Sequence, residues 1–156
     1  MSVNELDKLI KDIVVLATEL KNKFTHEVSA PVNYACIFAQ KQEEYEDLIR
    51  AAARLGTVIM EMTNGLLFEL AGIETMSGTL KLLKIRQPYP TRPERGDADF
   101  TVADFSGFKQ AYLNKTGFKL IVRPQLKMEM IQLKQPGYKV RAYFSNPPLA
   151  KALGLE

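Results

Sequence analysis

Two short stretches of the sequence each carry a lysine and an arginine two positions apart. Lys84 and Arg86 lie in LKIRQ, and Lys139 and Arg141 lie in YKVRA. Charged residues that alternate with apolar ones are typical of a strand, in which alternate side chains share one face. Two guanidinium groups that converge in a partly dry cleft suit a carboxylate or a phosphate, because charge-assisted hydrogen bonds are about twice as strong as neutral ones. If the two strands line one cleft, they predict an anion-binding site.

A third strand is predicted over 98–104, in ADFTVAD, and it supplies an acidic side chain. If Phe100 and Val102 pack under helices, alternation points Asp99 to the opposite face, toward the site. We expect Asp99 to orient one of the two guanidinium groups.

Alternation also assigns faces in the first and last strands. In the last strand, over 138–144, Tyr143 shares a face with Lys139 and Arg141. In the first strand, over 32–39, one set is expected to face the site and the other to pack against a helix. The first set is Asn33, Ala35 and Ile37, and the second is Tyr34, Cys36 and Phe38.

The composition is that of a single globular domain. The chain has 156 residues, of which 46% are hydrophobic and 25% are charged, and this excludes a disordered chain. The net charge is only +3, and the lysines and arginines are interspersed with acids, which argues against a nucleic-acid partner. Cys36 is the only cysteine, so an intrachain disulfide is excluded. No stretch approaches the ~20 apolar residues that span a bilayer, and we expect a cytoplasmic protein with no membrane partner.

Residues 1–28 predict an N-terminal helical extension. Apolar residues recur at helical spacing from Leu6 to Phe24, and Ser2 with Glu5 has the pattern of a capping box. The apolar stripe needs a partner, which is either the domain itself or a second copy of the chain. Packing on the domain is favoured, and a homodimer is the alternative.

The rest of the chain predicts two copies of a strand–helix–strand–strand–strand unit. In each copy the helix ends at a glycine, Gly56 or Gly117. Asn64-Gly65 predicts a hairpin in the first copy, because this dipeptide tolerates the positive φ of tight turns. The predicted segments are repeat 1 at 32–87, repeat 2 at 97–145, the whole domain at 32–146 and a C-terminal tail at 147–156.

This duplicated βαβββ unit resembles the vicinal oxygen chelate superfamily, which includes glyoxalases, extradiol dioxygenases and bleomycin-resistance proteins. The resemblance implies an α+β fold in which two βαβββ repeats form a U-shaped mixed sheet with helices outside and a cleft inside. The N-terminal helix is then an addition to that fold. The resemblance also implies that the first and last strands of each unit present the site, where relatives usually hold a divalent metal.

The residues at these ligand-like positions depart from that pattern; they are Asn33, Arg86, Asp99 and Arg141. An arginine is always protonated and offers no lone pair to a metal. The only histidine, His26, precedes both repeats. We therefore predict no metal and no cofactor. The alternative is a cage for an oxygen-preferring metal, made by Glu61, Glu69, Asp99 and Glu129.

The function that fits these features is metal-free binding of a small anionic or aromatic molecule in the cleft. The predicted ligand-binding residues are Asn33, Lys84, Arg86, Asp99, Lys139, Arg141 and Tyr143. No catalytic residue can be assigned. Two alternatives stay open: a metal-dependent lyase, isomerase or dioxygenase of the same superfamily, and a buried ion network without a ligand. Arg92 and Arg95, in the loop between the repeats, are expected to be solvated.

Overall fold

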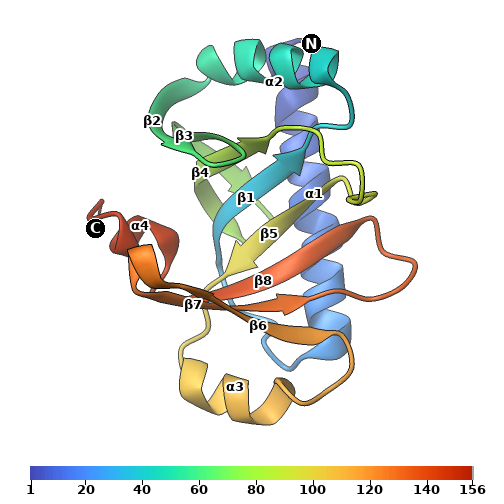
Figure 1. The fold of residues 1–156 in the computed structure, drawn as a ribbon, viewed down its shortest axis with the longest axis vertical. Coiled ribbons are helices and arrows are strands. Elements are labelled where there is room, and N and C mark those ends of the chain that lie inside the picture. Colours follow the sequence, from blue (N-terminus) through green and yellow to red (C-terminus); the bar gives the residue numbers. More distant parts are fainter. Residues whose placement is uncertain (156) are drawn as a thin grey trace.

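The computed structural model describes residues 1–155 as an α+β fold built on a single sheet (Figure 1). In this part of the chain, four α-helices and one short 3-10 turn accompany a sheet of eight strands. The helices are α1 (Val3–Phe24), α2 (Gln42–Ala53), α3 (Phe105–Tyr112) and α4 (Leu149–Ala152), and the 3-10 turn is η1 (Pro124–Leu126). The strands are β1 (Val32–Phe38), β2 (Gly56–Met62), β3 (Gly65–Thr75), β4 (Gly78–Arg86), β5 (Gly96–Phe100), β6 (Phe118–Arg123), β7 (Met128–Leu133) and β8 (Val140–Asn146).

The sheet consists of two equivalent halves joined at its centre. Its strand order is β2-β3-β4-β1 in one half, followed by β5-β8-β7-β6 in the other. In each half the first strand pairs in parallel with the last, while β1 and β5 pair in antiparallel fashion across the junction. The predicted arrangement of two βαβββ repeats in a mixed sheet is confirmed.

Helix α1 lies along the sheet and belongs to its core. Figure 1 shows it running behind β1, β5 and β8, so that it contacts strands of both halves. Its buried apolar residues are Leu6, Ile10, Ile13, Val14, Ala17 and Leu20. At its start the predicted capping box is present, and the Glu5 backbone N–H donates to Ser2 Oγ at 3.0 Å. The partner of the apolar stripe is therefore the chain's own sheet, and the homodimer stays a prediction.

The Asn64-Gly65 hairpin between β2 and β3 forms as predicted, but for a different reason. Neither residue has a positive φ. Instead, a side chain at Gly65 would collide with β4, because its Cβ would lie 2.0 Å from the Ile85 carbonyl oxygen. The glycine is needed for close strand approach and not for turn geometry.

The face of the sheet opposite α1 is called the cleft face. The C-terminal helix α4 lies on this side of the sheet in Figure 1. Its Leu149 packs in a small apolar cluster with Leu67 and Leu82 of one half and Met130 and Tyr143 of the other. The tail therefore covers part of the junction between the halves. Among residues 1–155, no helix has the length and apolar character needed to cross a membrane.

The docking of α1 predicts a strong asymmetry between its two faces. Replacing the buried Ile10 by alanine leaves a cavity under the sheet, so the free energy of unfolding should fall by about 2–5 kcal/mol. The matched control is Leu16→Ala, because Leu16 is 37% exposed on the same helix, and it should change the value by about 0.5 kcal/mol or less. Urea unfolding measures both. Equal effects of the two variants would contradict the packing of α1.

Candidate functional site

One row of polar side chains crosses the junction between the two halves on the cleft face. Lys84 of β4 lies opposite Cys36 of β1, which lies opposite Asp97 of β5. Asp97 in turn lies opposite Arg141 of β8. Directly opposite residues share a face, so the four side chains project on the same side of the sheet. Burial raises the pKa of the Cys36 thiol, which makes it a poor nucleophile.

Asp97 is a buried carboxyl group with incomplete hydrogen bonding. Asp97 is only 6% exposed, and its Oδ1 atom has no hydrogen-bond partner. Burial and the nearby charge of Asp99 raise the pKa of Asp97 to about 7. The positive charges of Lys84, Arg86 and Arg141 oppose that rise. Asp97 thus lies in the field of cations from both halves.

Asp99 is fully buried one step further along β5, and it is held by neutral partners. Asn33 Nδ2 donates to its Oδ1 at 2.9 Å, and the Ser145 hydroxyl donates to its Oδ2. Burial raises its pKa to about 7, while these hydrogen bonds act in the opposite direction. The hydrogen bond that a guanidinium group was expected to donate to Asp99 is not formed; Asn33 and Ser145 are the side chains that donate to its oxygens.

Arg141 is neutralised by a residue that the sequence did not indicate. Its Nε donates to Glu94 Oε1 at 2.6 Å, and both side chains are nearly inaccessible to solvent. One terminal nitrogen also donates to Gln132 Oε1 at 3.2 Å, and that oxygen accepts the Tyr143 hydroxyl at 3.0 Å. Burial acts to raise the Glu94 pKa, but the hydrogen bond from Arg141, a backbone hydrogen bond and the charges of Arg141 and Lys134 together lower it. The positive charge of Arg141 is therefore already balanced by Glu94, and it does not require an anionic ligand.

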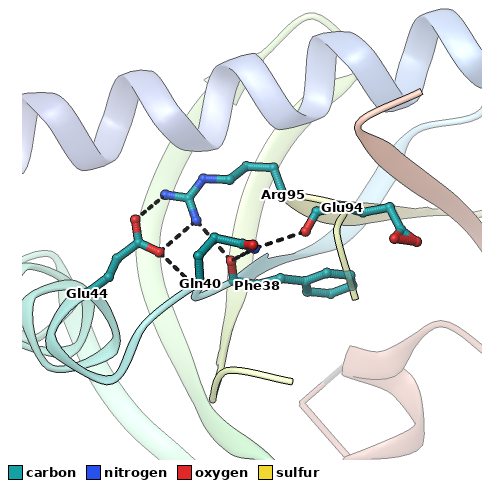
Figure 2. A network of polar contacts seen from close by, with 5 residues as sticks. All are labelled: Phe38, Gln40, Glu44, Glu94 and Arg95. Atoms are coloured by element: carbon teal, nitrogen blue, oxygen red, sulfur yellow. Dashed lines mark hydrogen bonds and ion pairs between the residues drawn. The ribbon is translucent and has the colours of Figure 1, made fainter. Parts of the chain in front are cut away.

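The loop that carries Glu94, between β4 and β5, is fixed by a second polar network (Figure 2). Both terminal nitrogens of Arg95 donate to the Glu44 carboxylate, at 2.9 and 2.8 Å, and one also donates to the Phe38 carbonyl oxygen. Gln40 Nε2 donates to the carbonyl oxygens of Phe38 and Glu94, at 3.0 and 3.2 Å. The prediction of a solvated Arg95 is wrong, because its fork anchors this loop to α2 and β1.

Arg86 has surroundings unlike those of Arg141. Its guanidinium carbon lies 5.4 Å from the centre of the Phe38 ring and 5.5 Å from that of Tyr89. Burial lowers its pKa, and the positive charge of Arg92 lowers it further. The two arginines that the sequence pairs by symmetry therefore differ: one is neutralised by an acid, and the other is stacked on aromatic rings beside a second cation.

A cavity of about 300 Å³ opens on the cleft face between the two halves. Lys84 and Tyr34 contribute from the central strands, Arg123 from the end of β6, and Leu149 from α4. Met60, Met62, Met128 and Met130 also line it, and we call these four the methionine wall; polar residues such as Glu61 and Gln125 complete the lining. Lys84 has neither an ion-pair nor a hydrogen-bond partner among residues 1–155, so its ammonium group is available to a ligand in this cavity.

A second cavity, of about 420 Å³, lies on the other side of α4. Ala150 and Leu155 line it from the C-terminal segment, and Asn33, Glu69 and Lys81 line it from the sheet. Because Leu149 faces the first cavity and Ala150 the second, the C-terminal segment divides the space above the cleft face. The sequence predicted a single open cleft and gave no sign of this division.

The face assignment of the first strand is wrong from its third residue onward. Ala35 and Ile37 pack in the core under the helices, whereas Tyr34 packs in the cleft-face cluster. The cause is a β-bulge, because Val32 and Tyr34 pair with the adjacent residues Phe100 and Asp99 of β5. Asn33 is the extra residue, and alternation counted through a bulge changes sides.

The other predicted site residues have mixed positions. Lys84 and Arg86 face the cleft from β4, and Tyr143 faces it from β8, as alternation indicated. Lys139 precedes β8 and is exposed, and it lines neither cavity. The residues that sequence analysis missed are Asp97, which alternation from Asp99 implied, and Glu94, for which no pattern existed.

The residues present do not fit the divalent metal that members of this fold usually hold. On the cleft faces of β4 and β8 stand Lys84 and Arg141, which are cations and not ligands. The alternative carboxylate cage does not assemble either: Glu129 binds Lys109 of α3 at 3.1 Å on the other face. Within residues 1–155, no three His, Cys, Asp or Glu side chains are grouped to hold a metal ion.

Comparison with known proteins establishes the fold. No family model and no curated protein matches the sequence. A structural-genomics target, protein EC4020, aligns with a TM-score of 0.73 and 12% identity over 98% of this chain and 92% of that chain. A glyoxalase/bleomycin resistance protein/dioxygenase superfamily member from Vibrio splendidus 12B01 aligns with a TM-score of 0.51 and 9% identity, over 74% and 97%. The chain has the vicinal oxygen chelate fold. These identities support the shared fold alone, which the duplicated repeat had indicated.

The buried carboxyl pair predicts that stability depends on pH. The pKa values of Asp97 and Asp99 are about 7 in the folded protein, whereas the ordinary value is 3.8. Between pH 3.8 and about 7, the folded state therefore binds more protons than the unfolded state. The contribution of the pair to the free energy of unfolding should therefore fall as pH rises from about 4 to about 7 and then level off.

Asp97→Asn removes the part of this pH dependence that comes from Asp97, because the amide cannot ionise. The loss of unfolding free energy between about pH 4.5 and 7.5 should be smaller in this variant than in the wild type by about 1 kcal/mol or more. Chemical unfolding at the two pH values measures it, with Glu46→Gln on the exposed side of α2 as the control. A variant that keeps the full wild-type pH dependence would contradict the assignment.

Proposed function

We propose that the protein binds a small organic anion in the 300 Å³ cavity, without a metal ion. The observation that supports this most strongly is the unpaired ammonium group of Lys84. The two fully buried cations among residues 1–155 are satisfied internally: Arg141 by Glu94, and Lys21 by the carbonyl oxygens of Glu27 and Val28. Lys84 is half-buried and has no such partner. A buried charge without a partner is costly, so a ligand of opposite charge is the natural complement of Lys84.

The electrostatics around Lys84 favour an anion. Burial lowers the Lys84 pKa, and the positive charges of Arg86 and Arg123 lower it further, while Cys36 and Asp97 act in the opposite direction. An anion in the cavity would offset the repulsion among the cations and stabilise the charged form of Lys84. Binding should therefore be accompanied by proton uptake wherever Lys84 is partly neutral in the free protein.

The cavity walls favour a ligand with an apolar body. The thioether side chains of Met60, Met62, Met128 and Met130 are polarisable and flexible, and they adapt to aromatic surfaces. The volume is at the lower end of ligand pockets, which suits a body of about one ring. The proposed ligand is thus a small aromatic or apolar molecule bearing a carboxylate or phosphate. A metal-dependent enzyme is not proposed, because cations occupy the ligand positions of β4 and β8.

Thermal unfolding with benzoate and phenyl phosphate tests this proposal. A ligand at 100 times its Kd stabilises by about 2.7 kcal/mol, which is about 5–10 °C in Tm for a domain of this size. Lys84→Met keeps the length of the side chain and removes its charge, and it should abolish most of the shift. The control is Lys41→Met, at the exposed N-cap of α2. A shift of wild-type size in Lys84→Met, or none with either anion in the wild type, would refute the proposed site.

A further inference from the structure

Four side chains form a compact group where β4 ends and the loop toward β5 begins. Arg86 lies against Phe38 and Tyr89, and Arg92 lies against the same two rings, with its guanidinium carbon 5.7 and 5.9 Å from their centres. The two guanidinium groups thus share one pair of aromatic neighbours. We call Phe38, Arg86, Tyr89 and Arg92 the arginine clamp.

Neither guanidinium of the clamp has an acceptor among residues 1–155. Arg86 Nε is buried and has no hydrogen-bond partner. By contrast, Arg50, Arg95 and Arg141 are each paired with a carboxylate. Asp97 is close enough for its charge to act on Arg86, but its Oδ1 atom is also without a partner. The two rings lie within cation–π distance of both guanidinium groups, and this interaction does not use the N–H donors.

The two positive charges of the clamp also repel each other. After burial, the charge of Arg92 has the largest effect in lowering the Arg86 pKa. Among residues 1–155, no acid forms an ion pair with either guanidinium to relieve this repulsion: Glu94 is engaged by Arg141 and Glu44 by Arg95, and Asp97 acts on Arg86 only through its charge. An oxyanion between the two forks would supply both the missing acceptors and the missing negative charge.

We propose that the arginine clamp binds the phosphoryl group of the ligand. A dianionic phosphate monoester matches the charge of two guanidinium groups and offers three oxygens, whereas a carboxylate has a single charge and two oxygens. Tyr89 is 53% exposed and Phe38 only 2%, so the clamp is open to solvent on one side and closed by the sheet on the other. This inference rests on the proposed function, since it names the acidic group of that ligand.

The clamp adjoins the cavity, so one molecule can use both. Lys84 and Arg86 are two residues apart on β4, so their side chains share one face of the strand, and Lys84 lines the cavity. Arg86 also lies opposite Gly65, which pairs with the cavity residue Met62. A phosphoryl group held at the clamp therefore directs the rest of the ligand past Lys84 toward the methionine wall. The ligand class is an aromatic or apolar phosphate monoester.

Calorimetric titration of phenyl phosphate and benzoate at constant ionic strength tests the clamp. Wild-type protein should bind phenyl phosphate more tightly than benzoate. Arg92→Gln and Arg86→Gln should each lower the affinity for phenyl phosphate by about tenfold or more, and the affinity for benzoate by about threefold or less. Lys84→Met should weaken both ligands. The matched control is Arg50→Gln, on the exposed side of α2, which should change neither affinity.

Equal weakening of both ligands by the arginine variants would overturn the clamp and leave the anion site of Lys84 intact. No preference for phenyl phosphate in the wild type would overturn it as well. If neither organic anion binds, the proposed function fails, and the clamp is then judged by NMR with inorganic phosphate. The Arg86 Nε–H resonance, assigned by its loss in Arg86→Lys, should move with phosphate in wild type but not in Arg92→Gln. An unmoved resonance would overturn the clamp by itself.

Discussion

The antiparallel pairing of β1 with β5 is the constraint on which the rest of the structure depends. It joins the two repeats into one sheet, so the central strands have the helix core on one face and the cleft on the other. Polar side chains on their cleft face are withdrawn from water, and every charge there needs a partner. Asn33 and Ser145 donate to Asp99, whereas the buried Oδ1 atom of Asp97 has no hydrogen-bond partner.

The connection between the repeats decides which cations remain free. Glu94 reaches back to neutralise Arg141, and Arg95 fixes the loop by binding Glu44, so the acids of this region are engaged in holding the fold. The same loop brings Arg92 beside Arg86 and adds no acid for either. The result is a cleft face on which Arg141 of the second half is paired with an acid, whereas, within residues 1–155, Lys84 and Arg86 of the first half are not. That asymmetry within a symmetric fold supports anion binding.

The sequence contained enough information for the fold and for only part of the site. Element order and glycine positions predicted both repeats, because these depend on local periodicity. Alternation placed Lys84 and Arg86 correctly on β4, which is regular in this region. It failed on β1, because the bulge at Asn33 leaves no signal in a single sequence. The pairing of Glu94 with Arg141 was not predictable, because a loop residue has no periodicity to follow and its position depends on the anchor at Arg95.

The central claim is that the cleft face holds unpaired cations poised for an acidic ligand. A crystal structure of the protein grown with saturating phenyl phosphate tests it most directly. The account predicts the phosphoryl oxygens within hydrogen-bond distance of Arg86 and Arg92, and the ring beside Lys84 against the methionine wall. A structure in which Arg86 instead pairs with Asp97 and the anion lies outside the cleft would contradict it.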